Sequence, residues 1–533
     1  MSLPRCNENV TSKDLSARPG REYLPEYTLP PAAPHNRFAL YAAVNVAFCV
    51  VVGIACAVGA PQNPRILYLI LMFALCSSSI IDIDGLNGRY SLLGIFLFAY
   101  FIMYGLGDLG ALAEGAVTEQ SRAPLSVPEI VILIGGAILV LAYRLVISSL
   151  YPGRAASVPR DWSFRAILFV GFLMWAVGSY GTYQWYVHIV TDTTNEAVQR
   201  GLHSRSGYDI SANILAQMMQ PLGILLIAYA WRAFRLRALL LPVVGIVAFQ
   251  VFVGFVADIK GLAMLGGILV IVTATLIDNR VPKLWLACAV AYAILVFPIF
   301  QAYRTEVHGN RGIARTAVVE NFGKILQLAL SAENRVNSGR HRAQTLLERS
   351  SLRASVQMIV ERTGNGVPYQ DGYTLTPLAA TFIPKIIWPD KPDVPTGQLV
   401  NKEFHVAEGE DVYISPSHLG ELYWNFGWPG VLMGMSTIGG ILGFVGARFN
   451  LGAGKTVTRL LIVVVTIKQV VMGFEGVIAA SYVVWLRSMA GIGLLHLLLA
   501  RLPARSGDGA IGPDSRLPAI SAITIKLFAN LMD

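Results

Sequence analysis

Residues 431–447 read VLMGMSTIGGILGFVGA, and with the residues just before them they form an apolar block over 427–447. A helix of about 20 apolar residues is long enough to span the hydrocarbon core of a bilayer. Blocks of this kind recur along the 533-residue chain, which is 54% hydrophobic and 14% charged. Soluble domains carry about 25% charged residues. The sequence therefore predicts an all-α polytopic membrane protein.

About twelve transmembrane helices are expected from these blocks. They cover 38–60, 65–82, 91–110, 128–149, 164–186, 211–231, 238–257, 261–278, 283–301, 427–447, 459–478 and 480–500. The expected organisation is a disordered cytoplasmic tail (1–37), nine helices (38–301), a large outer loop (302–426), three helices (427–500) and a second cytoplasmic tail (501–533). The first tail is polar and Pro-rich, without the apolar region of a signal peptide.

Basic residues follow the even-numbered predicted spans, whereas connections such as 61–64 carry none. They are Arg144, Arg154, Arg160, Arg165, Arg232, Arg235, Arg237, Arg280, Lys283, Arg448, Lys455 and Arg459. Cytoplasmic loops of membrane proteins are enriched in Lys and Arg, so both termini are predicted to be cytoplasmic. This topology explains the net charge of +9 without nucleic-acid binding.

Two familiar kinds of site are excluded by spacing. Four of the five cysteines lie in apolar runs and no CxxC occurs, which argues against a disulfide framework or a cysteine metal site. The GAGKT string at 452–456 resembles a phosphate loop, but Phe449 stands where the first glycine is needed. It also follows a membrane helix rather than a strand, so we interpret it as a cytoplasmic connection.

The predicted outer loop, 302–426, is long enough to be a functional unit. Helical spacing of apolar residues occurs at 314–330 and 342–362, and Gly and Pro at 363–397 indicate turns around one short helix. A smaller polar outer loop covers 187–210.

Charged and aromatic groups gather at the outer ends of the predicted spans. The stretches are 255–265, 297–312, 382–392 and 415–430. Arg304 follows the ninth span directly, and Lys260 lies in a tight connection. Arg binds phosphate bidentately and Lys supplies a point charge, so an anionic ligand at the outer interface is expected.

Each candidate also has a structural interpretation. Arg304 would serve as a snorkelling anchor, Lys260 would pair with Asp258, and tryptophans would belong to the interfacial belt. Lys468 and Arg487 lie inside the last two spans, where cations are functional hypotheses unless they pair, for example with Glu475. Their roles stay open at this stage.

PKIIWPDKP (384–392) and SPSHLGELYWNFGWPG (415–430) resemble two elements of the Wzy-type oligosaccharide repeat-unit polymerases of bacterial surface polysaccharides. The DIKG at 258–261 is similar to a turn of that family and of the related O-antigen ligases. The resemblance implies a GT-C-like membrane glycosyltransferase of the bacterial inner membrane. It would transfer a growing glycan from undecaprenyl diphosphate to the non-reducing end of a new lipid-linked unit, without metal or cofactor.

The resemblance and the charge pattern together give a set of candidate residues. Arg304 is expected at the diphosphate, and His418 and Glu421 are candidates to accept the proton of the sugar hydroxyl or orient it. The expected substrate-binding residues are Lys260, Arg200, Arg205, Lys385, Trp388, Lys391, Tyr423, Trp424 and Asn425. Among them Trp388, Tyr423 and Trp424 are expected to stack on sugar rings. The implied partners are the undecaprenyl-diphosphate-linked oligosaccharide, membrane lipids and a chain-length regulator protein.

Two alternatives remain open. An O-antigen ligase would use the same donor with another acceptor, and ligases more often have His-Asn where this chain has His418 and Leu419. A transporter or flippase of a lipid-linked saccharide suits twelve spans, but such proteins often contain inverted repeats, and none is evident in the sequence.

Overall fold

The computed structural model describes residues 34–59, 65–81, 91–106, 125–150, 162–192, 207–256, 260–288, 352–380, 383, 388, 394, 396–406, 413–449, 451 and 455–500. Within these residues all regular secondary structure is helical, apart from one isolated β-bridge between Thr363 and Val367. The longer helices are α1 (Pro34–Gly59), α2 (Arg65–Ser77), α3 (Leu92–Tyr104), α5 (Val127–Leu150), α6 (Phe164–Asp192), α7 (Gly207–Ala233), α8 (Leu240–Val256), α9 (Lys260–Asp278), α17 (Ser417–Arg448), α18 (Val457–Thr466) and α19 (Ile478–Leu499). The shorter elements are η1 (Ser78–Ile81), η3 (Arg237–Leu239), α14 (Arg353–Arg362), η5 (Tyr373–Leu375), α15 (Thr376–Ala379), α16 (Thr396–Phe404), η7 (Ile467–Val471) and η8 (Met472–Glu475).

Seven stretches of the described chain are long and apolar enough to cross a membrane. They are Val127–Leu150, Phe164–Gln184, Arg237–Gly254, Gly261–Asp278, Ser417–Arg448, Val457–Glu475 and Ile478–Leu499. Shorter apolar helices cover Ala39–Val52, Ile66–Ile81 and Leu92–Tyr104. The predicted class, an α-helical polytopic membrane protein, is confirmed. The number twelve stays a prediction, because most of the predicted span 283–301 lies outside the described residues.

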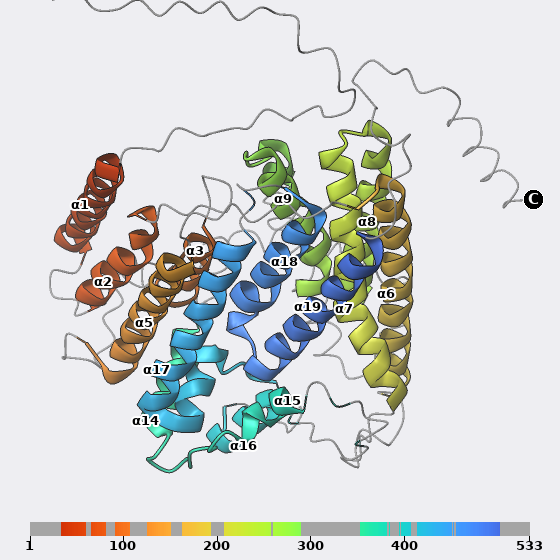
Figure 1. Cartoon of the computed structure of the whole chain (residues 1–533). Helices are drawn as coiled ribbons and strands as arrows, with labels where there is room; N and C mark the ends of the chain where they lie inside the picture. The colour runs from red at the N-terminus through yellow and green to blue at the C-terminus, as the bar shows by residue number, and fades with distance from the viewer. Residues whose placement is uncertain are drawn as a thin grey trace, which may run out of the picture.

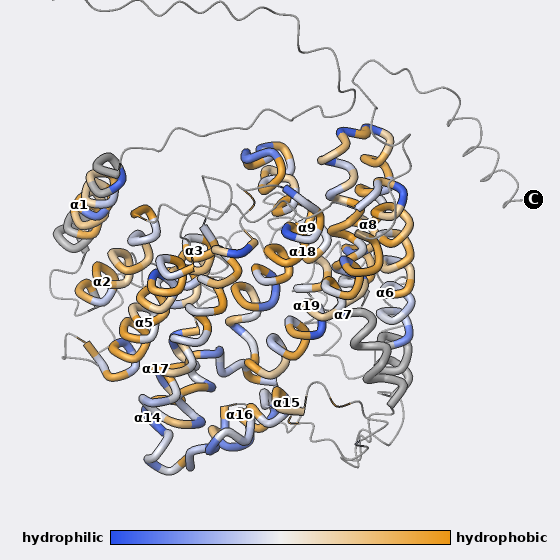
Figure 2. Tube along the Cα trace, in the orientation of Figure 1, coloured by the Kyte–Doolittle hydropathy of each residue, from blue (hydrophilic) through white to orange (hydrophobic). Residues whose placement is uncertain are grey.

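The helices pack side by side, and α14, α15 and α16 gather at one end of the bundle (Figure 1). Helix α17 packs along α5, α6 along α7, and α8 against α9. Apolar residues run along the helices, while the segment with α14 to α16 is more polar (Figure 2). We call this the α14–α16 end.

Glycines let two of these helices approach closely. A Cβ on Gly439 of α17 would lie 2.3 Å from the Leu139 carbonyl oxygen of α5, and one on Gly443 would lie 2.8 Å from the Tyr143 carbonyl. Small residues four apart are a common device for packing helices within membranes, where apolar burial alone does not drive association. The α5–α17 pair is therefore a fixed part of the scaffold.

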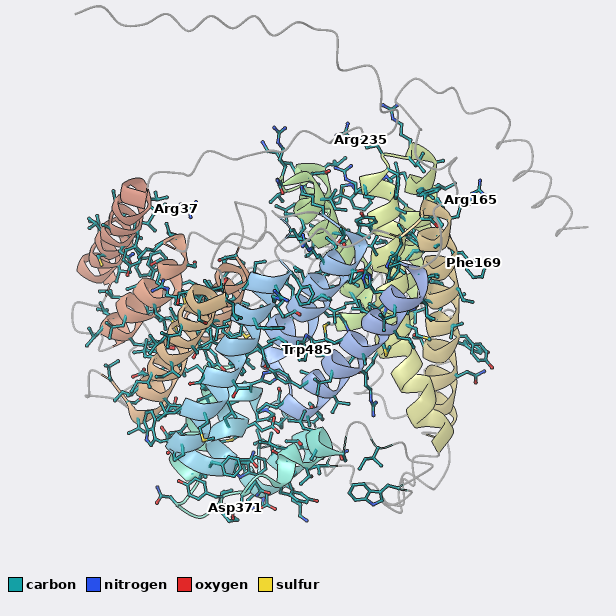
Figure 3. The ribbon with its side chains drawn as sticks, viewed as in Figure 1. Arg37, Arg165, Phe169, Arg235, Asp371 and Trp485 are labelled. Atoms are coloured by element: carbon teal, nitrogen blue, oxygen red, sulfur yellow. The ribbon has the colours of Figure 1, made fainter. Side chains whose placement is uncertain are left out.

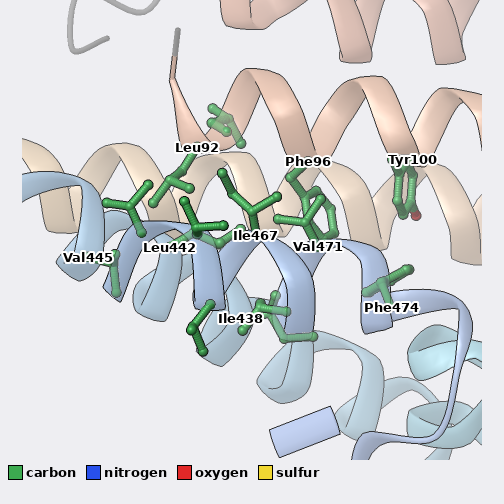
Figure 4. Close-up of a cluster of buried hydrophobic side chains, with 14 of the residues drawn as sticks. Leu92, Phe96, Tyr100, Ile438, Leu442, Val445, Ile467, Val471 and Phe474 are labelled. Carbon is green, nitrogen blue, oxygen red and sulfur yellow. The ribbon is translucent and has the colours of Figure 1, made fainter. Parts of the chain in front are cut away.

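Figure 4 shows the core against which the Val457–Glu475 span packs. Leu92 and Phe96 of α3 lie against Ile467 and Val471, and Leu442 of α17 closes the cluster. All five side chains are buried. This packing fixes which side of the Ile467–Val471 segment faces the core.

The two ends of the bundle differ in charge. Arg37, Arg165 and Arg235 lie toward the end opposite α14 to α16, whereas Asp371 lies at the α14–α16 end (Figure 3). The arginines belong to tails and connections that the sequence assigns to the cytoplasm.

Candidate functional site

A break in α17 shapes the candidate site. Gly427 has φ +61° and ψ −141°, values that leave the helical region, and Pro429 follows two residues later. Glycine adopts positive φ without a steric cost, and proline has no N–H to donate. Helix α17 begins at Ser417, so residues 417–426, which the sequence assigns to the end of the outer loop, are helical.

The break leaves backbone carbonyls of α17 without helical donors, and N–H groups of a neighbouring turn donate to them instead. Without an N–H on Pro429, the Asn425 carbonyl lacks its usual helical donor. The Asp371 N–H donates to that carbonyl at 3.2 Å, and the Gln370 N–H donates to the Trp424 carbonyl at 3.0 Å. The 370–372 turn is thereby attached to the break in α17.

Glu421 lies at the centre of a buried polar network. Its side chain is 0% exposed. The Thr374 hydroxyl donates to Oε1 at 2.8 Å, and the backbone N–H of Ile478 donates to Oε2 at 2.7 Å. Ile478 is the first residue of α19, so the carboxylate caps a helix N-terminus, where a negative charge is stabilised. One side chain thus joins α17, η5 and α19.

Asn425 extends the network by one helical turn. Its Nδ2 donates to Thr374 Oγ1 at 2.7 Å and to the Glu421 carbonyl at 2.8 Å. Its Oδ1 accepts the N–H of Gly372 at 3.0 Å. Gly372 has φ +87°, which is suited to glycine. Glu421, Asn425 and Thr374 therefore hold the turn in one conformation, and we call these three residues the Glu421 network.

His418 lies one turn before Glu421 on α17, as the spacing predicted, and is also 0% exposed. Its ring packs against Phe474 and Tyr482, with centroids 5.0 and 5.4 Å away. Within the described residues neither ring nitrogen makes a hydrogen bond of standard geometry, although backbone groups of Gly473 and Val477 lie near. The Tyr482 hydroxyl is likewise buried and has no hydrogen-bond partner in the part of the chain that the structure describes. Such groups are uncommon in native interiors and are candidates for a functional role.

The three aromatic candidates fall in different environments. Trp424 is fully buried and packs edge-on against Phe404 at 5.3 Å, so it is a core residue and offers no surface to a sugar. Tyr423 is also buried, beside Trp428. Trp388 is 40% exposed and remains suited to stacking on a ring. The proposed stacking role is therefore wrong for Trp424 in this conformation, because neighbouring side chains cover the indole.

An ion pair near the site joins two residues that the sequence did not single out. Arg353 of α14 contacts Glu129 of α5 at 2.5 Å, and its guanidinium lies over the Tyr68 ring at 5.4 Å. Glu129 Oε2 also accepts the Ser126 N–H at 2.7 Å. The Ser-x-x-Glu spacing is the signature of a capping box and identifies the start of α5. The pairing of Glu129 with Arg353, 224 residues away, cannot be predicted from the residues around either of them.

Most of the predicted cationic residues lie outside the described residues: Arg304, Arg200, Arg205, Lys385 and Lys391. Lys260 begins α9, but its side chain lies outside them too. Their roles stay predictions.

Lys455, the lysine of the GAGKT string, has a structural role. Its Nζ donates to the Ile277 carbonyl and, at 3.2 Å, to Asn279 Oδ1. These acceptors lie at the C-terminal end of α9, where a cation is favourable. The contacts agree with the interpretation of 452–456 as a connection.

No cluster of His, Cys, Asp or Glu suited to a metal ion occurs among the residues described above. Comparison with protein-family models found no matching family, and searches of curated proteins and of solved structures found no similar protein.

Proposed function

We propose that this chain is a membrane glycosyltransferase that polymerises oligosaccharide units carried on undecaprenyl diphosphate. The reaction would take place at the α14–α16 end, on the outer face of the bacterial inner membrane. In this topology the arginine-rich end faces the cytoplasm.

The observation that carries the proposal is the broken entry of α17. The SPSHLGELYWNFGWPG element supplies His418, Glu421 and Asn425, together with the break at Gly427 and Pro429. A buried polar network of this kind is expensive in a membrane protein unless every group is satisfied, and such sites are usually functional. The network lies next to α15 and α16, which flank the PKIIWPDKP element.

The contacts favour a positioning role for Glu421. Both of its carboxylate oxygens already accept hydrogen bonds, so the side chain holds η5 and α19 rather than waiting for a sugar hydroxyl. His418, whose ring nitrogens make no hydrogen bond of standard geometry to the described residues, is the better candidate to accept a proton, and for this the Phe474 and Tyr482 rings that now cover it would have to move aside. Arg304 is the proposed group at the diphosphate, where negative charge develops on the leaving group.

The test uses purified protein in detergent with undecaprenyl-diphosphate repeat units from its own host, with EDTA present. Wild-type protein is expected to give a ladder of lengthened lipid-linked glycan. Arg304→Ala and His418→Ala should abolish the ladder. Lys402→Ala, a change at an exposed lysine of α16, is the control and should leave it intact.

A wild-type sample that gives no ladder from intact substrate contradicts the polymerase proposal. A transferase that moves the glycan to a lipid A core acceptor instead identifies the ligase alternative. Movement of labelled substrate across liposomes without any new bond identifies the transporter.

A further inference from the structure

Lys468 is a cation within a candidate membrane span, Val457–Glu475. It lies in the same span as Glu475, seven residues before it. The side chain is half-buried, and among the described residues no hydrogen bond or ion pair reaches its ammonium group. In particular, the pairing with Glu475 that the sequence left open is not formed. A charge at this depth without a partner is costly.

The backbone changes form at this residue. Helix α18 ends at Thr466, residues Ile467–Val471 form a π-helix, and Met472–Glu475 form a 3₁₀ turn. Short π-helical segments are rare and occur frequently at functional sites, because they turn side chains out of the regular helical register. The bulge is thus a second feature that singles out Lys468.

The core packing indicates which side of the bulge is free. Ile467, Val470 and Val471 are buried. Ile467 and Val471 face α3 (Figure 4), and α19 packs against the segment as well. Lys468 and Gln469 are the two residues of the segment that this packing leaves half-buried. The bulge therefore offers one ammonium and one amide beside the apolar interior.

We infer that Lys468 binds a phosphate group of a lipid-linked substrate drawn in from the α14–α16 end. This inference rests on the proposed function and adds an anion-binding residue to it. A phosphate would provide the charge partner that the described part of the chain does not supply at Lys468, and the adjoining apolar helices would accept the polyprenyl chain. The same chemistry would also accept the phosphate of an ordinary anionic phospholipid.

The experiment measures binding of farnesyl diphosphate to the purified full chain in nanodiscs of phosphatidylcholine. Lys468→Met removes the charge at similar volume, and Lys468→Arg keeps it. Lys402→Met is the matched control at an exposed lysine. Loss of one charge-assisted contact should weaken binding by about 10-fold or more in Lys468→Met. Lys468→Arg and Lys402→Met should stay within about 3-fold of wild type.

A second arm repeats the titration in phosphatidylglycerol nanodiscs. One outcome is that wild type binds farnesyl diphosphate more weakly in phosphatidylglycerol than in phosphatidylcholine, while Lys468→Met binds it equally in both. This result identifies bulk anionic lipid as a competing occupant of the same phosphate site. Unchanged binding supports selectivity for the diphosphate ligand.

Thermal unfolding without ligand provides the structural control. If Lys468 serves a ligand, Lys468→Met should unfold at the same or a higher temperature, because an unpaired charge has been removed from the bilayer. Equal affinity of Lys468→Met and wild type overturns the inference, even if wild type polymerises. If Lys468→Met loses binding but wild type makes no polymer, the phosphate site stands and the polymerase assignment fails.

Discussion

Replacement of Glu421 tests whether this side chain positions the site or transfers a proton. Glu421→Ala leaves the buried Ile478 N–H and the Thr374 hydroxyl without their acceptor. Each buried unsatisfied group costs about 1–3 kcal/mol, so for two groups we expect a loss of about 2–6 kcal/mol of unfolding free energy. The negative charge at the start of α19 is lost as well.

Glu421→Gln is expected to be milder. The amide oxygen still accepts the Ile478 N–H, and the amide nitrogen can donate to Thr374 Oγ1, but the Thr374 hydroxyl hydrogen then loses its acceptor. The loss is this one donor and the charge at the helix N-terminus, about 1–3 kcal/mol. Glu361→Ala, at an exposed glutamate of α14, is the control and should change stability by less than about 0.5 kcal/mol.

The assay is reversible unfolding by SDS in mixed micelles, followed by tryptophan fluorescence, with glycan polymerisation measured on the same samples. The expected order of stability is wild type, then Gln, then Ala, with polymerisation retained in the Gln variant. An Ala variant as stable as wild type refutes the network as a structural element. If Glu421→Gln is stable but does not polymerise the glycan, the positioning role of Glu421 is refuted and proton transfer by Glu421 becomes the better explanation.

Three further substitutions test the scaffold by the same unfolding assay. Gly439→Ala should lower the unfolding free energy by about 1–3 kcal/mol, because its Cβ would meet a carbonyl of α5. Gly440→Ala should leave it unchanged, because the atom nearest to its Cβ lies 3.9 Å away. Equal effects of the two substitutions would contradict the close packing. Gly427→Ala should lower the unfolding free energy by about 1–3 kcal/mol, because a residue with a Cβ rarely adopts this backbone conformation, and a neutral result would mean that the break is absent. Glu129→Gln should lower the unfolding free energy by removing the charge of the carboxylate that contacts Arg353, and addition of Arg353→Met should recover part of that loss. No recovery would contradict the pairing.

The sequence by itself determined the class of the protein and much of its linear organisation. Apolar blocks of membrane-spanning length are a local property, because each helix satisfies its own backbone hydrogen bonds in lipid. For the same reason, the last two spans begin and end within a few residues of the predicted bounds. The helical spacing of His418 and Glu421 was also readable locally, since three residues make nearly one turn.

Only the tertiary structure decided what those residues contact. Thr374 and Ile478 reach Glu421 from segments 47 and 57 residues away, and no local pattern encodes such a meeting. The structure likewise buried Trp424 and left Lys468 without an ion pair among the described residues. Burial and pairing depend on which helices pack together, and in a membrane that choice follows from shape and close contact more than from hydrophobicity.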